Sequence, residues 1–210
     1  MLRSVLSLRL AERRLVIATG NEGKLGEYRR LLAGAGLELI PFDPRVEEVG
    51  ETYAENARLK AEAARDAQLL LAVGDDSGVE VDVLGGFPGI RSARIGPTQK
   101  ERTQALLDRL QGHPRPWLAR FVCTIALATP GRPTEFFEGE CRGEIIPEWR
   151  GHAGFGYDPV FLVPEAGTTF GEMSADEKAQ YSHRARAVRA MLAAGAIPSP
   201  PGGRGSGSGA

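Results

Sequence analysis

Short apolar runs alternate with helical patterns in the first part of the chain. The run Leu15 to Thr19 stops at Gly20-Asn21, and the apolar residues between Leu25 and Leu32 then recur at helical spacing. This order predicts a strand, a tight turn and a helix. A second strand is expected at Leu37 to Pro41.

Three capping boxes mark the starts of further helices, because each pairs a Ser or Thr with a Glu three residues later. They predict helices from Thr52 through Ala67 and from Thr98 to about Gln111. The third box, at Ser174, predicts a final helix that carries Lys178, His183 and Arg184.

A continuous apolar run, Leu69 to Val73, predicts a buried strand. It is followed by Gly74-Asp75-Asp76-Ser77-Gly78, so both carboxylates are expected just beyond the strand end, where open α/β sheets place their chemistry. Val79 to Leu84 can continue as another strand. The segment Gly85 to Gly89 is rich in Gly and Pro and predicts a shaped loop.

The middle of the chain reads as a long hairpin. Trp117 to Thr129 and Thr134 to Ile146 are rich in β-branched and aromatic residues and are separated by a Pro-Gly-Arg-Pro turn. A glycine-rich loop, Gly151 to Pro159, precedes a short strand at Val160 to Val163. Strands that first alternate with helices and then form a hairpin predict an α/β fold with a mixed sheet.

The composition fits one globular domain, because 210 residues with 42% apolar content can bury a substantial core. A formal net charge of −1 lowers the expectation of nucleic-acid binding. No apolar run approaches the roughly 20 residues that span a bilayer. A soluble protein of the cytoplasm with no membrane or nucleic-acid partner is therefore expected.

The two ends and the two cysteines have plain interpretations. Residues 1–14 carry four arginines and read either as a weak organellar presequence or as a frayed extension. Residues 195–210 are dominated by Pro, Gly and Ser and are expected to be a disordered tail. Cys123 and Cys141 lack metal-ligand spacing and are expected to be reduced structural thiols.

A candidate phosphate site lies at the first strand-to-helix turn, where free backbone N–H groups and the helix dipole favour an anion. Lys24 adds a positive charge to this turn. The spacing is too short for a common P-loop, and Leu25 stands where a P-loop has Ser or Thr. The alternative is a plain turn with a solvated lysine. The turn comprises Thr19, Gly20, Asn21, Glu22, Gly23 and Lys24.

Carboxylates form the second candidate group. Asp75 and Asp76 are adjacent and point in different directions, and Glu47 and Glu48 are their natural partners. Mg²⁺ prefers a few hard oxygen ligands together with water and substrate phosphates, so this set suits it. An Asp-Asp-Ser-Gly turn without a metal is the alternative, since these residues serve turns well.

Two aromatics in a glycine-rich loop form the third group. Phe155-Gly156-Tyr157-Asp158 offers an aromatic face that suits a nucleobase. His183 and Arg184 are neighbours on the expected last helix, where a solvated helix face is the alternative interpretation.

Together and in this order, the segments from about Leu15 to Leu192 resemble the inosine triphosphate pyrophosphatase family. The motifs that carry the resemblance are Thr19-Gly20-Asn21-Glu22-Gly23-Lys24, Glu47-Glu48-Val49-Gly50 with Glu55-Asn56-Ala57, Asp75-Asp76-Ser77-Gly78, Gly85-Gly86-Phe87-Pro88-Gly89, Phe155-Gly156-Tyr157-Asp158 and Ser182-His183-Arg184. The resemblance implies an elongated mixed sheet whose flanking helices form two lobes around a central cleft. It also implies a homodimer, and a pyrophosphatase domain over residues 15–194.

The resemblance further implies roles for individual residues. Asp76 matches the family's general base and one of its metal ligands. Glu47 matches a second metal carboxylate, with Glu48 as the alternative, and Asp75 matches a supporting carboxylate. The remaining residues match substrate contacts. They are the turn Thr19 to Lys24 with Ser77 at the triphosphate, Phe155 stacked on the base, Asp158 at the base edge, and Lys178, His183 and Arg184 closing over the nucleotide.

The implied activity is Mg²⁺-dependent hydrolysis of deaminated purine nucleoside triphosphates, those of inosine, deoxyinosine and xanthosine, to the monophosphate and pyrophosphate. A 6-oxo purine offers an acceptor where adenine offers a donor, so Arg184 or backbone N–H groups are expected to discriminate against ATP. Two other functions compete. One is a pyrophosphatase for modified pyrimidine or methylated nucleotides, and the other is a nucleotide-binding regulatory module without turnover.

Overall fold

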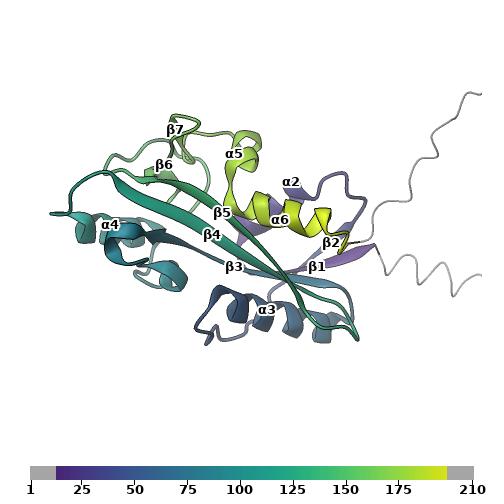
Figure 1. The fold of residues 1–210 in the computed structure, drawn as a ribbon. Coiled ribbons are helices and arrows are strands. Elements are labelled where there is room, and N and C mark those ends of the chain that lie inside the picture. Colours follow the sequence, from purple (N-terminus) through teal and green to yellow (C-terminus); the bar gives the residue numbers. More distant parts are fainter. Residues whose placement is uncertain (1–12, 198–210) are drawn as a thin grey trace, which may run out of the picture.

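The computed structural model describes residues 13–197 and shows a seven-stranded mixed sheet flanked by helices (Figure 1). The strand order is β2-β1-β3-β4-β5-β6-β7. The strands are β1 (Arg14–Ala18), β2 (Glu38–Phe42), β3 (Ala72–Val81), β4 (Trp117–Ala128), β5 (Glu135–Ile145), β6 (Phe161–Val163) and β7 (Thr168–Thr169).

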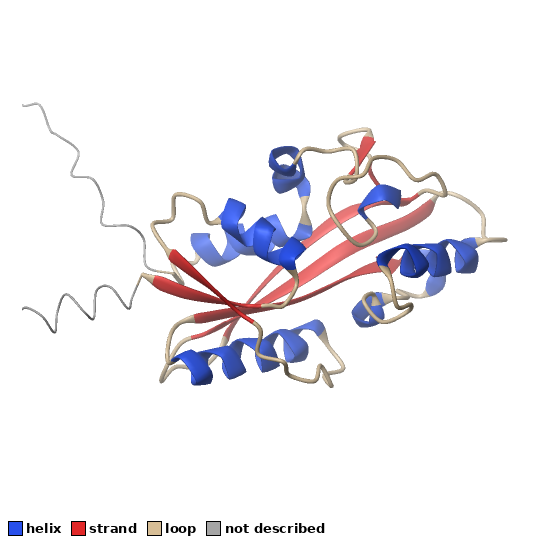
Figure 2. Ribbon diagram, turned by 180° about the vertical axis from the view of Figure 1, so that it is seen from behind, coloured by secondary structure: helices blue, strands red, loops and turns tan. Residues whose placement is uncertain are grey.

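The helices cover both faces of this sheet. Helices α2, α5 and α6 lie on one face, and α3 lies on the opposite face (Figures 1 and 2). Helix α4 packs farther along the long strands, in one cluster with Val79, Val81 and Phe121. The bounds of the helices are α2 (Glu22–Leu31), α3 (Tyr53–Gln68), α4 (Gln99–Leu110), α5 (Ala175–Tyr181) and α6 (His183–Ala193). Three short 3-10 turns are η1 (Asp82–Leu84), η2 (Gly89–Arg91) and η3 (Asp158–Val160). No helix in residues 13–197 is long and apolar enough to cross a membrane.

The predicted mixed α/β fold is confirmed. Strands β2, β1 and β3 run parallel, and β3 to β7 pair in antiparallel fashion. All three capping boxes are present, at Thr52, Thr98 and Ser174. These local signals hold because each side chain satisfies a free N–H group of its own helix start.

Strand β3 differs from the sequence prediction, which ended one strand at Val73 and began another at Val79. The structure shows one strand from Ala72 to Val81, because its whole length pairs with β4. Only its first three residues also pair with β1. Asp75 and Asp76 therefore lie within a strand, next to the point where β1 ends and leaves the edge of β3 open.

Two hydrophobic cores explain the two expected lobes. One joins α2 and α6 to β1, Val73 and the nearer part of β4. The other joins α4 and the segment from Tyr157 to Met173 to Val79, Val81 and the farther ends of β4 and β5. The polar residues of β3 occupy the interval between these cores, so the cleft opens where apolar packing is interrupted.

Three further details correct the sequence prediction. The expected last helix is two helices, because Ser182 ends α5 and its hydroxyl caps the start of α6 by accepting from Ala185 N. The expected tail boundary is also wrong, since Ile197 is buried in the core with α6. Arg14, placed in the N-terminal extension, starts β1. The rest of the expected extension and tail, residues 1–12 and 198–210, lies outside the described residues.

The packing of α6 on β5 gives a stability test. A Cβ at Gly139 would lie 2.2 Å from the carbonyl oxygen of His183 and 2.4 Å from the N of Ala187. Both contacts are with helix backbone, which cannot rotate away. We expect Gly139→Ala to lower the free energy of unfolding by about 2 kcal/mol in urea titration, although Ala is the better strand former.

The neighbouring substitution Glu138→Ala is the matched control, because Glu138 is exposed and the alternation of the strand turns it away from α6. Its effect should stay within about 0.5 kcal/mol. Equal stability of the two variants would show that α6 does not press on β5 at this position.

Candidate active site

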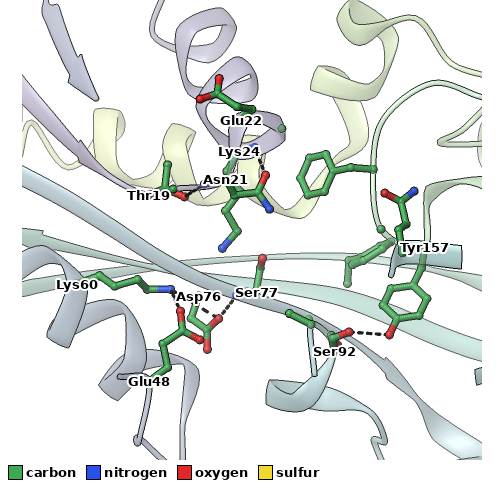
Figure 3. Close-up of a pocket in the computed structure, with 18 of the residues that line it drawn as sticks. Thr19, Asn21, Glu22, Lys24, Glu48, Lys60, Asp76, Ser77, Ser92 and Tyr157 are labelled. Carbon is green, nitrogen blue, oxygen red and sulfur yellow. Dashed lines mark hydrogen bonds and ion pairs between the residues drawn. The ribbon is translucent and has the colours of Figure 1, made fainter. Parts of the chain in front are cut away.

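A cleft of about 550 Å³ lies between the two cores (Figure 3). Three walls form it: the turn between β1 and α2, the open edge of β3, and the loop before η3. The sequence-predicted residues that line it are Thr19, Gly20, Asn21, Glu22, Gly23, Lys24, Asp76, Ser77, Phe155, Gly156, Tyr157, Asp158, Lys178 and His183. Three predicted residues, Glu47, Asp75 and Arg184, are absent from this lining.

The predicted phosphate turn has the expected geometry. Asn21 caps α2, and its side-chain oxygen accepts from Lys24 N at 3.1 Å, while Asn21 N donates to the Thr19 hydroxyl. The start of a ten-residue helix therefore faces the cleft, and its dipole favours an anion there. The Lys24 ammonium extends from this wall toward β3 (Figure 3).

Opposite this turn, two carboxylates flank a lysine. Lys60, on α3, lies 2.7 Å from Glu48 Oε1 and 4.0 Å from Asp76 Oδ1. Asp76 also accepts from Asn56 Nδ2 at 3.1 Å and from Ser77 N at 2.9 Å. Figure 3 shows Glu48, Lys60 and Asp76 gathered below Lys24.

The two carboxylates differ in acidity. Burial raises the pKa of Asp76 and outweighs the attraction of Lys60 and Lys24, so its proton affinity is greater than that of an ordinary aspartate. Burial favours the neutral form of Glu48 as well, but the attraction and hydrogen bonds of Lys60 and Arg94 outweigh this effect and lower the pKa of Glu48. Asp76 is thus the better proton acceptor of the pair, and Glu48 stays ionised.

The structure separates the two glutamates that the sequence left open. Glu48 lines the cleft, whereas Glu47 is exposed and does not. The loop places alternate side chains on opposite sides, and Lys60 and Arg94 hold the Glu48 side chain in place. Of the two glutamates that the sequence offered as a metal carboxylate, Glu48 is therefore the one that faces the cleft, and Glu47 is not.

Asp75 and Arg184 lie beneath the cleft rather than in it. The alternation of β3 directs Asp75 to the face opposite Asp76, where it is 2% exposed. Arg184 is fully buried and donates to Asp75 at 2.8 Å, to Glu27 and to the Ser77 hydroxyl at 3.0 Å. With its donors occupied in this way, Arg184 is not placed to contact a base edge, which corrects that expectation.

Asp75 is correspondingly not open to a metal. Its Oδ2 atom accepts from Arg184 and lies 3.0 Å from Lys24 Nζ. Burial opposes ionisation, but Arg184 and Lys24 outweigh it and hold the pKa of Asp75 well below its usual range. Its role here is to fix Lys24 and Arg184.

A second group of charges continues from Arg184 to the other end of the cleft. Glu27 pairs with Arg184 and with Lys178 at 2.7 Å, and Lys178 pairs with Asp158 at 2.6 Å. Asp158 in turn accepts from Phe155 N at 2.8 Å. Six charged side chains therefore form an alternating series. We call Lys24, Asp75, Arg184, Glu27, Lys178 and Asp158 the ion chain.

The aromatic loop sits at the end of the ion chain. The Phe155 ring lies 4.8 Å from Lys178 Nζ and packs against Gly23, where a Cβ would approach it to 2.5 Å. Tyr157 is nearly buried and donates its hydroxyl to the Ser92 carbonyl oxygen at 2.7 Å. Phe155 therefore offers the aromatic face, and Tyr157 anchors the loop to the far lobe.

His183 lines the same end and is neutral at pH 7, because burial and the nearby Arg184 lower its pKa. Its ring stacks on Phe121, with centroids 4.7 Å apart and planes at 9°. Its buried Nδ1 atom has no hydrogen-bond partner in the described part of the chain. Buried polar atoms without a partner are rare in folded proteins, so this atom stands out among the groups at the cleft.

Sequence reasoning missed two residues that the structure brings to the site. Lys60 lies eight positions after Thr52, which starts the capping box, and its sequence context is that of an ordinary surface lysine. In the structure it is only 8% exposed. Glu27 lies in the middle of α2 among other charged residues. The signal that could have found them is helical spacing, since Glu27 follows Lys24 by three positions and Lys60 follows Asn56 by four.

The comparisons with known proteins agree with this arrangement. The sequence model of the Ham1 family matches residues 15–194. The chain belongs to the Ham1 family. This stretch covers every described residue of the cleft and the ion chain.

Curated relatives of this Ham1 chain are named dITP/XTP pyrophosphatase. The protein from Gloeobacter violaceus is 54% identical over 180 residues, which cover 85% of this chain and 92% of the relative. A protein from Thermus thermophilus is 49% identical over 190 residues, covering 86% and 91%. These names confirm the resemblance to the inosine triphosphate pyrophosphatase family.

Solved Ham1 structures share the fold. A HAM1 protein from Coxiella burnetii matches with a TM-score of 0.77 and 35% identity, covering 86% of this chain and 97% of that one. The Staphylococcus aureus Ham1 protein matches with a TM-score of 0.75 and 38% identity, covering 86% and 96%.

The ion chain predicts an acid-sensitive stability. Burial raises the pKa of Glu27, but Arg184 and Lys178 outweigh it and lower the pKa from 4.5 to about 2. A carboxylate whose pKa is lowered by folding stabilises the folded state at pH values above its pKa in the unfolded chain. This stabilisation is lost as the pH falls from about 4.5 toward 2. The shift corresponds to about 3 kcal/mol.

We therefore expect Glu27→Gln to destabilise the protein most at pH 7, by about 3 kcal/mol. The difference from wild type should shrink as pH approaches 2. Urea titrations at several pH values measure it. A difference that does not change between pH 7 and pH 3 would mean that Glu27 is not charged within the ion chain.

Proposed function

We propose that this chain hydrolyses deaminated purine nucleoside triphosphates to the monophosphate and pyrophosphate. The observation that carries the proposal is that one cleft holds a phosphate turn and, facing it, the carboxylates of Asp76 and Glu48. The names of the curated relatives support the substrate class and the pyrophosphate product.

Mg²⁺ fits the residues of the cleft. Asp76 and Glu48 supply two hard oxygen ligands, and Mg²⁺ in phosphate chemistry commonly uses one or two carboxylates with water and substrate phosphates. Residues 13–197 hold no group of three or more metal-binding side chains, so water and substrate phosphates would supply the other ligands. When bound, Mg²⁺ would neutralise phosphate charge during the displacement.

The chain's own residues perform the remaining steps. The start of α2 and Lys24 bind the phosphates, and Phe155 stacks on the base. Asp76 accepts the proton of the attacking water, and its raised pKa makes it a suitable base. Water adds to phosphorus, the bond between the α and β phosphates breaks, and pyrophosphate leaves with the electron pair.

Base selection must come from groups other than Arg184. The candidates on the lining are His183, whose Nδ1 atom lacks a partner among the described residues, and the backbone around Phe155 and Gly156. Arg184 acts from below by positioning Asp75 and Ser77. We further propose that the enzyme works in the cytoplasm as a homodimer, which rests on the family resemblance and is measured by light scattering of the purified protein.

Turnover across a panel of nucleoside triphosphates, with Mg²⁺ and then with EDTA, tests the proposal. We expect pyrophosphate release from inosine, deoxyinosine and xanthosine triphosphates, weak release from ATP, and loss of activity in EDTA. Preference for modified pyrimidine or methylated nucleotides would favour the competing pyrophosphatase. Binding without turnover would favour a regulatory module.

Asp76→Asn is expected to lower kcat by about 100-fold or more, since the amide accepts a proton poorly and is a weak ligand of Mg²⁺. The variant should be as stable as wild type or more stable. Because the folded-state pKa of Asp76 is raised, ionisation of this group opposes folding above its unfolded pKa, and Asn removes that cost. Near-normal turnover by the folded variant would contradict the assignment.

Glu48 and Glu47 form a matched pair for the metal. Glu48→Gln should raise the Mg²⁺ concentration for half-maximal activity by about tenfold or more, whereas Glu47→Gln should leave it unchanged. Titration of activity with Mg²⁺ measures both. The reverse outcome would restore Glu47 as the ligand.

A further inference from the structure

The lysines of the cleft are already paired with carboxylates. Lys24 lies 3.0 Å from Asp75, Lys60 lies 2.7 Å from Glu48, and Lys178 lies 2.6 Å from Asp158. A phosphate that binds one of these lysines must compete with the carboxylate that is already paired with it. A triphosphate carries several negative charges, so a cation without such a partner would bind it with less competition.

Arg45 is such a cation. It lines the cleft, and within residues 13–197 no carboxylate lies within ion-pair distance of its guanidinium and no hydrogen bond involves its side chain. Arg102, the other arginine of the lining, already donates to the carbonyl oxygens of Ala93 and Gly96.

The backbone holds Arg45 in an unusual conformation. Its φ is 49°, in the left-handed region that a residue with a Cβ seldom adopts. Leu69, the other non-glycine residue with positive φ in the described chain, ends helix α3, a position where this conformation is common. Arg45 has no helix to end, and its N donates to the Asp43 carboxylate at 3.1 Å.

The same loop is fixed against the phosphate turn. The Asp43 carboxylate packs on Gly20, where a Cβ would approach it to 2.8 Å, and Thr19 N donates to the Phe42 carbonyl oxygen at 2.9 Å. Glu48 follows three residues after Arg45. The loop therefore begins against Thr19 and Gly20 through Phe42 and Asp43, and two residues after Asp43 it brings Arg45 to the lining of the same cleft.

We propose that Arg45 binds the terminal phosphates of the substrate and the pyrophosphate that leaves. This inference rests on the proposed function and adds to it a phosphate-binding residue outside the motifs of the sequence analysis. A guanidinium is suited to this task, because its planar donors match phosphate oxygens in pairs.

Arg45→Gly tests the proposal with little risk to the fold. Glycine adopts the left-handed conformation without strain, so the melting temperature should stay near the wild-type value. Pyrophosphate binding, measured by calorimetry with Mg²⁺, should weaken about tenfold, the effect of one charge-assisted hydrogen bond. Inhibition by inosine monophosphate, which lacks the terminal phosphates, should not change.

Two further variants sharpen the result. Arg45→Asn, which also tolerates a left-handed backbone, should reproduce the loss if Arg45→Gly folds poorly. Arg132→Gly removes an exposed arginine from the turn between β4 and β5, far from the cleft, and should leave pyrophosphate binding unchanged.

The proposal is overturned if Arg45→Gly binds pyrophosphate as tightly as wild type, or if it weakens pyrophosphate and inosine monophosphate by the same factor. The second result would mean that Arg45 only shapes the cleft. A wild-type chain that turns over no triphosphate, yet binds pyrophosphate through Arg45, would contradict the proposed function and leave this inference standing.

Discussion

The burial of six alternating charges in the ion chain is the constraint on which the site depends. Arg184 is fully buried at its centre, and an unpaired buried cation would cost several kcal/mol. Asp75 on one side and Glu27 on the other compensate it. Asp75 also pairs with Lys24, and Glu27 also pairs with Lys178. An uncharged residue at Asp75, Arg184 or Glu27 would therefore leave the charges of its neighbours unpaired.

This constraint joins the two ends of the cleft. One end of the ion chain holds Lys24 at the phosphate turn, and the other holds Asp158, which accepts from Phe155 N. The sheet contributes by alternation, because adjacent residues of β3 face opposite sides. Asp75 therefore belongs to the ion chain, while Asp76 faces the cleft on the opposite side of the same strand.

The sequence predicted local features better than long-range ones. The capping boxes at Thr52, Thr98 and Ser174 depend on neighbouring residues and were confirmed. The strand end predicted before Asp75 and Asp76 was wrong, because pairing with β4 continues the strand through both residues despite the preference of Gly, Asp and Ser for turns. The burial of Arg184 depends on partners 109 and 157 positions away, which no local pattern shows. The resemblance supplied most residues of the cleft, but it pointed to neither Lys60 nor Glu27. It also did not decide which of Glu47 and Glu48 faces the cleft.

The central claim is that the cleft releases pyrophosphate in one step from a deaminated purine triphosphate. Phosphorus NMR of the products from inosine triphosphate and Mg²⁺ tests it most directly. The account predicts inosine monophosphate and pyrophosphate in equal amounts from the earliest time points, with no diphosphate. Inosine diphosphate together with orthophosphate would contradict it, because the bond between the β and γ phosphates would then be the one that breaks.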